Sequence, residues 1–262
     1  MQLWIILPAY NEGKRIYATL EDYSKASWPN GISSRIVVVS DSTDETNSIV
    51  TKFAKRAGSI TLIKNKVRKG KGYAILKGFR YAIKNADHRS LIGFVDADDA
   101  VPSKEYSRMI KIMINKNADG IVASRYARNS VNVVKLKTQR VLASRCYNLL
   151  VRVIFGINLS DTQCGAKIFR YDALRKVIGR IVLLDVSFDL NILYEMKRAG
   201  FNIIEAGIVY LDKKGSSMNI KLPLRSAQMF IVAIGFRIYH STFNFILGSS
   251  VASFIHSHIK DW

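Results

Sequence analysis

The stretch LIGFVDADD, residues 91–99, joins an uninterrupted apolar run to a cluster of three carboxylates. Five apolar residues bounded by polar ones are typical of a β-strand buried on both faces, as strands are in parallel sheets that helices cover. The abrupt change at Asp96 marks the end of that strand. Because ligands of open α/β sheets bind beyond the carboxyl ends of the strands, the stretch also predicts the edge of the sheet at which function resides.

Short apolar runs alternate with longer helical patterns along the first half of the chain. Strands are predicted at residues 3–7, 35–39, 60–63, 91–95 and 120–124, and helices at 13–26, 44–57, 72–86 and 103–115. Such alternation favours right-handed crossovers. It therefore predicts an α/β fold with a mostly parallel, doubly wound sheet of the Rossmann-like kind.

Polar residues gather directly after four of these strands. The segments are PAYNE at 8–12, SDSTD at 40–44, DADD at 96–99 and the pair Arg125-Tyr126. The carboxyl ends of parallel strands share one edge of a sheet, where clustered carboxylates repel one another unless a cation or hydrogen-bond donors neutralise them. The sequence therefore predicts a polar ligand site at this edge.

Asp96 and Asp98 lie two residues apart at a strand end, so both side chains point toward one site. Carboxylate oxygens suit Mg²⁺ or Mn²⁺, which take one or two carboxylates and complete their coordination with water and substrate phosphates. We therefore expect a divalent ion that bridges a diphosphate. The alternative is structural: Asp98 or Asp99 could cap the helix that begins near Ser103.

The loop RKGKG, residues 68–72, precedes a predicted helix. Its glycines let backbone amides approach an anion, and the helix N-terminus adds partial positive charge, so Lys71 is a candidate ligand for a phosphate. The loop lacks the Gly-Lys-Ser/Thr signature of a Walker A motif. An ordinary flexible loop is the alternative interpretation.

The chain has 40 basic and 20 acidic residues, a formal charge of +20. The basic excess is concentrated in residues 120–160 and 213–260, which contain no carboxylate. Each stretch could be a solvated face. The alternative is a phosphate site together with an anionic membrane surface, where each Lys or Arg adds about 1 kcal/mol of attraction to lipid. Nucleic acid is disfavoured, because no nucleic-acid motif occurs.

The 262 residues suffice for one large or two small domains, and 48% apolar content excludes intrinsic disorder. Two cysteines are too few for a disulfide scaffold or a thiolate metal cage. The N-terminus lacks the basic flank and long apolar core of a secretory signal. These features predict a reducing, cytosolic setting. Together with the basic stretches and an apolar C-terminal segment, they predict a protein associated with the cytoplasmic face of a membrane.

Residues 222–254 are too apolar for a free tail. We expect a domain boundary near 217, with a catalytic domain at 1–217 and interfacial, membrane-associating helices at 218–262. A spanning helix at 238–255 is not favoured, because Ser, Thr, Asn and His dilute its apolar residues. An oligomer interface, as in a homo-oligomer, or core packing is the competing interpretation.

Taken together, these motifs resemble those of the family 2 glycosyltransferases with the GT-A fold, and among them the dolichyl- and polyprenyl-phosphate hexose synthases. The resemblance covers roughly residues 3–217. It implies a nucleotide-sugar site formed by Pro8, Ala9, Tyr10, Asn11, Glu12, Asp41, Lys71, Asp96 and Ala97. It implies Asp98, with Asp96, as the metal ligand. Ser40 and Ala100 depart from residues usual in the family.

On the acceptor side, the resemblance implies that Arg125, Arg140, Ser144 and Lys213 bind the lipid phosphate, with Asn148 continuing the helix pattern of Arg140 and Ser144. Spacings of four residues place those three on one helical face. Asp98, Arg125 and Asp189 are the implied catalytic residues. For Asp189 an ordinary helix cap or ion pair is the alternative.

The resemblance implies transfer of a hexose, with inversion, from UDP-glucose or GDP-mannose to dolichyl or polyprenyl phosphate. The segment DTQCGAK, residues 161–167, and Ala100 favour glucose over mannose. Two alternatives stay open: a sugar-phosphate nucleotidyltransferase, although its early glycine-rich basic loop is missing near Leu7, and a noncatalytic basic module that binds anionic lipid or nucleic acid.

Overall fold

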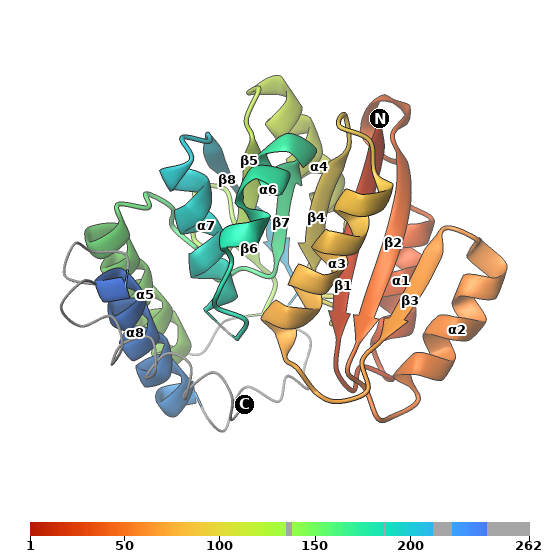
Figure 1. Ribbon diagram of the computed structural model, residues 1–262, viewed down its shortest axis with the longest axis horizontal. Coiled ribbons are helices and arrows are strands. Elements are labelled where there is room, and N and C mark those ends of the chain that lie inside the picture. Colours follow the sequence, from red (N-terminus) through yellow and green to blue (C-terminus); the bar gives the residue numbers. More distant parts are fainter. Residues whose placement is uncertain (135–137, 186, 212–221, 240–262) are drawn as a thin grey trace.

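The computed structural model describes residues 1–134, 138–185, 187–211 and 222–239 (Figure 1). The predictions for Lys213 and for residues 240–262 lie outside these ranges. The predicted boundary between 217 and 218 also falls in an undescribed segment.

A seven-stranded sheet forms the centre of the molecule, in the order β3-β2-β1-β4-β7-β5-β8. The strands are β1 Gln2–Ala9, β2 Ser33–Ser40, β3 Ile60–Lys64, β4 Leu91–Val95, β5 Gly120–Ser124, β7 Ala166–Arg170 and β8 Ile203–Gly207. All neighbours are parallel except β7, which runs antiparallel to β4 and β5. The predicted mostly parallel α/β sheet is confirmed, and β7 and β8 are the strands that periodicity did not predict. A short parallel pair joins β6 Val131–Asn132 to β9 Val209–Tyr210.

Helices cover both faces of the sheet (Figure 1). They are α1 Ile16–Ser24, α2 Thr46–Ala57, α3 Lys71–Asn85, α4 Ser103–Asn115, α5 Thr138–Phe155, α6 Tyr171–Val177, α7 Phe188–Arg198 and α8 Leu222–Tyr239, with short 3₁₀ turns at Pro29–Gly31 and Ile178–Arg180. Buried side chains of α1, α2 and α4 join one core cluster, whereas those of α3, α5, α6, α7 and α8 join the other. The sheet is therefore doubly wound, as predicted.

Strand side chains alternate between the two cores. In β1, Leu3, Ile5 and Leu7 face one cluster, while Trp4 and Ile6 face the other. Burial on both faces explains why these strands appear in the sequence as continuous apolar runs rather than as alternating patterns.

Two helices begin later than their sequence pattern predicts. Residues 11–13 and 42–46 hydrogen-bond to each other at the places where the first turns of the two helices were predicted. The backbone N–H of Gly13 donates to Oδ2 of Asp44 at 3.1 Å, and that of Glu12 donates to Oγ1 of Thr46 at 2.9 Å. The two polar segments after β1 and β2 thus form one connected edge.

Helix α8 packs on α5 at one end of the molecule (Figure 1). Its Phe236 is buried, with ring centroids 6.1 Å from Phe155 and 5.7 Å from Tyr194 of α7. Core packing, one of the interpretations left open for the tail, therefore accounts for the inner face of α8. Among the helices that the structure describes, none has the length and apolarity needed to cross a bilayer.

Candidate active site

Three carboxylates from two strand ends lie close together at the predicted edge of the sheet. Glu12 follows β1, and Asp96 and Asp98 follow β4. Burial raises the pKa of Glu12 above its ordinary value, and Asp98 and Asp96 raise it further, against the opposing effect of its ion pair with Arg15. This electrostatic coupling places negative charge in excess at one point, as the sequence predicted.

Burial raises the pKa of Asp98 as well, and the neighbouring Asp96 adds to the shift. Oδ1 of Asp98 accepts a hydrogen bond from the backbone N–H of Ala100 at 3.2 Å, within its own turn. The start of α4 is capped by a different residue: Asp22 of α1 accepts bonds from the N–H and the hydroxyl of Ser103, each at 2.7 Å. The interpretation of Asp98 as the α4 cap is therefore wrong, because Asp22 accepts the N–H of Ser103 instead.

Lys71, the first residue of α3, provides a cation beside the two aspartates. Its Nζ lies 2.6 Å from Oδ1 of Asp96. Burial would lower the pKa of Lys71, but Asp96, Asp189 and Asp98 outweigh burial and raise it. With Lys71 at Asp96 and Arg15 at Glu12, two cations face three carboxylates, so the cluster stays negative.

This donor set fits a divalent ion. Asp96 and Asp98 supply hard oxygen ligands, and their unbalanced charge favours a cation. Within the described ranges, no group of three or more His, Cys, Asp and Glu side chains is arranged to hold a metal. Phosphate and water oxygens would therefore complete the coordination of an ion held by the two aspartates.

Asp41, predicted to recognise the nucleotide base, also shapes the loop before α3. Oδ2 accepts the backbone N–H groups of Lys69 and Gly70 at 2.7 and 2.9 Å, and Oδ1 accepts Nδ2 of Asn65 at 2.6 Å. The loop that the sequence left open as merely flexible is thus fixed on Asp41, and it delivers Lys71 to the carboxylates.

The remaining residues of the predicted nucleotide site occupy the same edge. Pro8 and Ala9 end β1, and Ala97 is buried. Tyr10 is exposed, with the guanidinium carbon of Arg68 4.1 Å from the centre of its ring. Asn11 has a φ of 56°, and its Oδ1 accepts the N–H of Thr43 at 3.0 Å.

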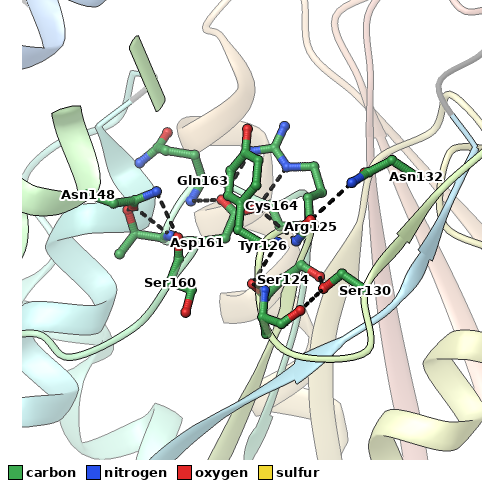
Figure 2. Close-up of polar contacts among 12 residues, drawn as sticks. Ser124, Arg125, Tyr126, Ser130, Asn132, Asn148, Ser160, Asp161, Gln163 and Cys164 are labelled. Carbon is green, nitrogen blue, oxygen red and sulfur yellow. Dashed lines mark hydrogen bonds and ion pairs between the residues drawn. The ribbon is translucent and has the colours of Figure 1, made fainter. Parts of the chain in front are cut away.

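Arg125, directly after β5, is held by a residue that the sequence reasoning did not select. Its Nε donates to Oδ2 of Asp161 at 2.7 Å and its Nη2 donates to Oδ1 at 3.0 Å (Figure 2). Asp161 is 0% exposed and Arg125 8%. Burial alone would raise the pKa of Asp161, but Arg125 holds it below its ordinary value. The two residues are 36 positions apart in the sequence, so no local spacing could indicate that they pair.

The loop 160–165 connects the two halves of the site. At one end Asn148 of α5 donates to the carbonyl of Ser160 and accepts from Thr162 (Figure 2). At the other end the carbonyl of Gly165 accepts the N–H of Asp96 at 2.9 Å. A Cβ added to Gly165 would overlap the Asp96 carboxylate. Arg125 and Asp96 therefore lie at opposite ends of one short, fixed loop.

These contacts give Asn148 a structural task, because both ends of its amide hold the loop rather than face an anion. Ser144 lies on the same helix and is half-buried. The side chain of Arg140 lies outside the described part. Cys164 is buried and burial raises the pKa of its thiol to about 12, so it is a neutral, space-filling side chain.

Asp189, at the start of α7, is buried and paired with the equally buried Lys167 of β7. Nζ of Lys167 also donates to the carbonyl of Cys164 at 2.9 Å. The ion pair that the sequence left open for Asp189 is thus what the structure contains. It fixes α7 against the loop 160–165.

The comparison with known families agrees with this geometry. Residues 4–178 match Glycosyl transferase family 2, and the chain belongs to that family. It is therefore a glycosyltransferase.

Among curated relatives, a dolichyl-phosphate beta-glucosyltransferase of Dictyostelium discoideum is 28% identical over 234 residues, covering 83% of this chain and 68% of the relative. An undecaprenyl-phosphate mannosyltransferase of Micrococcus luteus is 25% identical over 216 residues, covering 82% of this chain and 85% of the relative. Both names describe transfer to a polyprenyl phosphate.

Solved structures share the GT-A-like fold. Glucosyl-3-phosphoglycerate synthase from Mycobacterium tuberculosis, in complex with Mn²⁺, UDP and its product, gives a TM-score of 0.64 at 17% identity over 90% of this chain and 79% of that one. The mannosyltransferase PcManGT from Pyrobaculum calidifontis, in complex with GDP-Man and Mn²⁺, gives a TM-score of 0.62 at 20% identity. The match covers 97% of this chain and 69% of that one.

Proposed function

We propose that this glycosyltransferase moves a hexose from a nucleotide diphosphate sugar to a dolichyl or other polyprenyl phosphate, with inversion. Glucose is the favoured hexose and mannose the second. One observation carries the proposal: the loop 160–165 joins a carboxylate cluster to a fixed arginine. The first suits a metal-bound diphosphate and the second a phosphate. An enzyme that transfers a sugar between two anions needs both.

On the donor side, Asp98 and Asp96 would hold Mg²⁺ or Mn²⁺. When bound, the ion stabilises the negative charge that develops on the leaving diphosphate. Lys71 supports the same charge from the N-terminus of α3. Tyr10, Asn11 and Asp41 stand at the edge where the nucleoside would lie.

On the acceptor side, Arg125 positions the lipid phosphate, and we also assign Arg140, Ser144 and Lys213 to this group. A phosphate monoester has a second pKa of about 6, so it is already an ionised nucleophile at neutral pH. No strong general base is required. This agrees with the engagement of the Asp189 carboxylate in its pair with Lys167, so that Asp189 contributes by holding the loop in place.

Glucose is proposed before mannose because the segment 161–167 resembles the glucose-type enzymes and because several curated relatives are named as glucosyltransferases. UDP-glucose is accordingly the first donor to test and GDP-mannose the second. GDP-mannose is included as the second donor because one of the curated relatives is named a mannosyltransferase.

We further propose that the protein associates with the cytoplasmic face of an anionic membrane. Leu142, Leu149 and Val153 of α5 are 64%, 60% and 75% exposed and recur at spacings of seven and four residues. Ile231 and Ile234 of α8 are also exposed. An exposed apolar face next to a basic surface is typical of a helix pair in the lipid interface. A homo-oligomer would use the same face.

The test is a panel of UDP-glucose and GDP-mannose, radiolabelled in the sugar, with dolichyl phosphate and either Mg²⁺, Mn²⁺ or EDTA. The expected result is a labelled lipid with one donor that disappears with EDTA. Labelled product from a sugar phosphate and a nucleoside triphosphate instead would identify a nucleotidyltransferase. Lipid binding without turnover, unchanged in Asp98→Asn, would identify a noncatalytic module.

A further inference from the structure

Of the three cations assigned above to the acceptor phosphate, Arg140 and Lys213 have side chains outside the described part of the chain, and the charge of the third, Arg125, is compensated. Arg125 and Asp161 form a buried, bidentate pair whose charges cancel. A phosphate that approaches this pair would therefore meet hydrogen-bond donors on Nη1 but little net attraction. A doubly charged acceptor requires a further cation nearby.

Arg145 of α5 supplies a cation at this place. Its guanidinium carbon lies 5.5 Å from the centre of the Tyr126 ring, and that of Arg125 lies 5.4 Å from the same centre. One aromatic ring thus contacts both guanidinium groups. Among the residues that the structure describes, Arg145 has no carboxylate partner, and α5 contains no acidic residue.

The Tyr126 hydroxyl indicates that a polar ligand belongs here. This oxygen is buried and has no hydrogen-bond partner in the described part of the chain. In Figure 2 the hydroxyl and the guanidinium of Arg125 point to the same side of the loop. Buried hydroxyls are normally satisfied, so one left open beside two arginines fits an oxyanion.

Helix α5 also relates this position to the lipid. Arg145 lies three residues after Leu142 and four before Leu149, on the same exposed face of α5. An arginine between exposed apolar side chains keeps its charged end at the level of phosphate head groups. A lipid chain against this face would bring its phosphate to Arg145.

The geometry points to Tyr126 and Arg145 as acceptor-phosphate ligands, which together with Arg125 form an arginine–tyrosine–arginine clamp. This assignment rests on the proposed function, and it adds two residues that the sequence analysis did not assign to the acceptor phosphate. Arg125 is fixed by Asp161, while Arg145 brings the uncompensated charge.

The test measures the KM for dolichyl phosphate and for the nucleotide sugar separately, in the full chain. Arg145→Gln should raise the KM for dolichyl phosphate at least about tenfold, as expected for a lost hydrogen bond to a charged group. Arg145→Lys should recover part of that loss, and the KM for the nucleotide sugar should stay within twofold. Arg175→Gln, the same charge change on an exposed arginine of α6 outside the proposed membrane face, is the control and should leave both constants unchanged.

Tyr126→Phe separates ligand binding from structure. Because the hydroxyl bonds to no group in the described part of the chain, its removal should leave the melting temperature unchanged while the KM for dolichyl phosphate rises about fivefold. Equal lipid constants in wild type, Arg145→Gln and Tyr126→Phe would overturn the clamp while leaving the proposed function intact. A wild-type chain that transfers no hexose to dolichyl phosphate from either donor would overturn the proposed function and the clamp with it.

Discussion

Asp98 illustrates how a single side chain can favour activity at the expense of stability. Its pKa is raised in the folded state by burial and by Asp96. A carboxyl whose folded pKa exceeds its unfolded one stabilises the fold only at low pH and loses that contribution as pH rises from the unfolded toward the folded value. At neutral pH the charged form of Asp98 therefore lowers the free energy of unfolding of the metal-free protein.

We expect Asp98→Asn to raise the melting temperature in EDTA by about 2–4 °C and to lower turnover at least about a hundredfold. Mg²⁺ or Mn²⁺ should raise the melting temperature of the wild type by mass action but not that of the variant. Differential scanning calorimetry with and without metal measures the two changes in melting temperature, and the labelled-lipid assay measures turnover. A variant that is less stable than wild type in EDTA would contradict the electrostatic argument.

The pKa shift of Asp161 is opposite in sign to that of Asp98. Its folded pKa is lowered, so its contribution to stability is complete above the unfolded value of about 4 and is lost as pH falls through the folded value. Asp161→Asn should cost about 3–5 kcal/mol of unfolding free energy at pH 7, because it leaves the Arg125 charge buried without a partner.

Urea unfolding at pH 7, 5 and 3 measures this pH dependence. The difference between wild type and Asp161→Asn should stay nearly constant from pH 7 to 5 and shrink at pH 3. Asp172→Asn, an exposed aspartate on α6, serves as the control and should change stability by less than about 1 kcal/mol. A difference that grows on acidification would reject the ion pair as its source.

At the scale of elements, α5 combines two functions on opposite sides. Its inner face holds the loop 160–165 through Asn148 and packs against Phe230 of α8 through Tyr147, with ring centroids 5.7 Å apart. Its outer face exposes Leu142, Leu149 and Val153. One helix thus couples the catalytic loop to the proposed membrane surface.

Replacing Leu142 and Leu149 with Asn should lower binding to anionic vesicles about tenfold or more, since each Leu would no longer bury apolar surface in lipid. Co-sedimentation with phosphatidylserine-containing liposomes measures the effect. Val182→Asn, an exposed apolar residue outside α5, is the matched control. Unchanged liposome binding together with a smaller particle in sedimentation would assign the stripe to a homo-oligomer instead.

At the scale of the whole molecule, the reversed direction of β7 joins the two halves of the site. Because β7 lies between β4 and β5 and runs antiparallel to both, the loop that precedes it arrives at the edge where those parallel strands end. Gly165 then fits against Asp96 with no room for a side chain.

Gly165→Ala should therefore displace the Asp96 carboxylate and reduce kcat at least about tenfold, because a misplacement of about 1 Å suffices for large losses in rate. Gly179→Ala is the control, since a Cβ there would meet no other atom. Circular dichroism verifies that both variants fold. Equal activity in the two variants would show that Asp96 tolerates the shift.

The sequence predicted local features well where short-range patterns carry the information. The strands at 91–95 and 120–124 and the helix at 103–115 have the predicted bounds, because burial on both faces and 3.6-residue periodicity are properties of contiguous residues. Helices α1 and α2 begin later, because loop-to-loop hydrogen bonds between Gly13 and Asp44 replace the predicted first turns.

By itself, the sequence determined the α/β alternation, the edge that carries the polar residues and the carboxylates after β4, since each depends on neighbours along the chain. Tertiary structure alone decided that Asp161 fixes Arg125, that Lys167 pairs with Asp189 and that Arg145 lies against Tyr126. Those contacts join residues far apart in sequence. They form only because the antiparallel strand β7 and helix α5 bring distant segments together, which no local periodicity encodes.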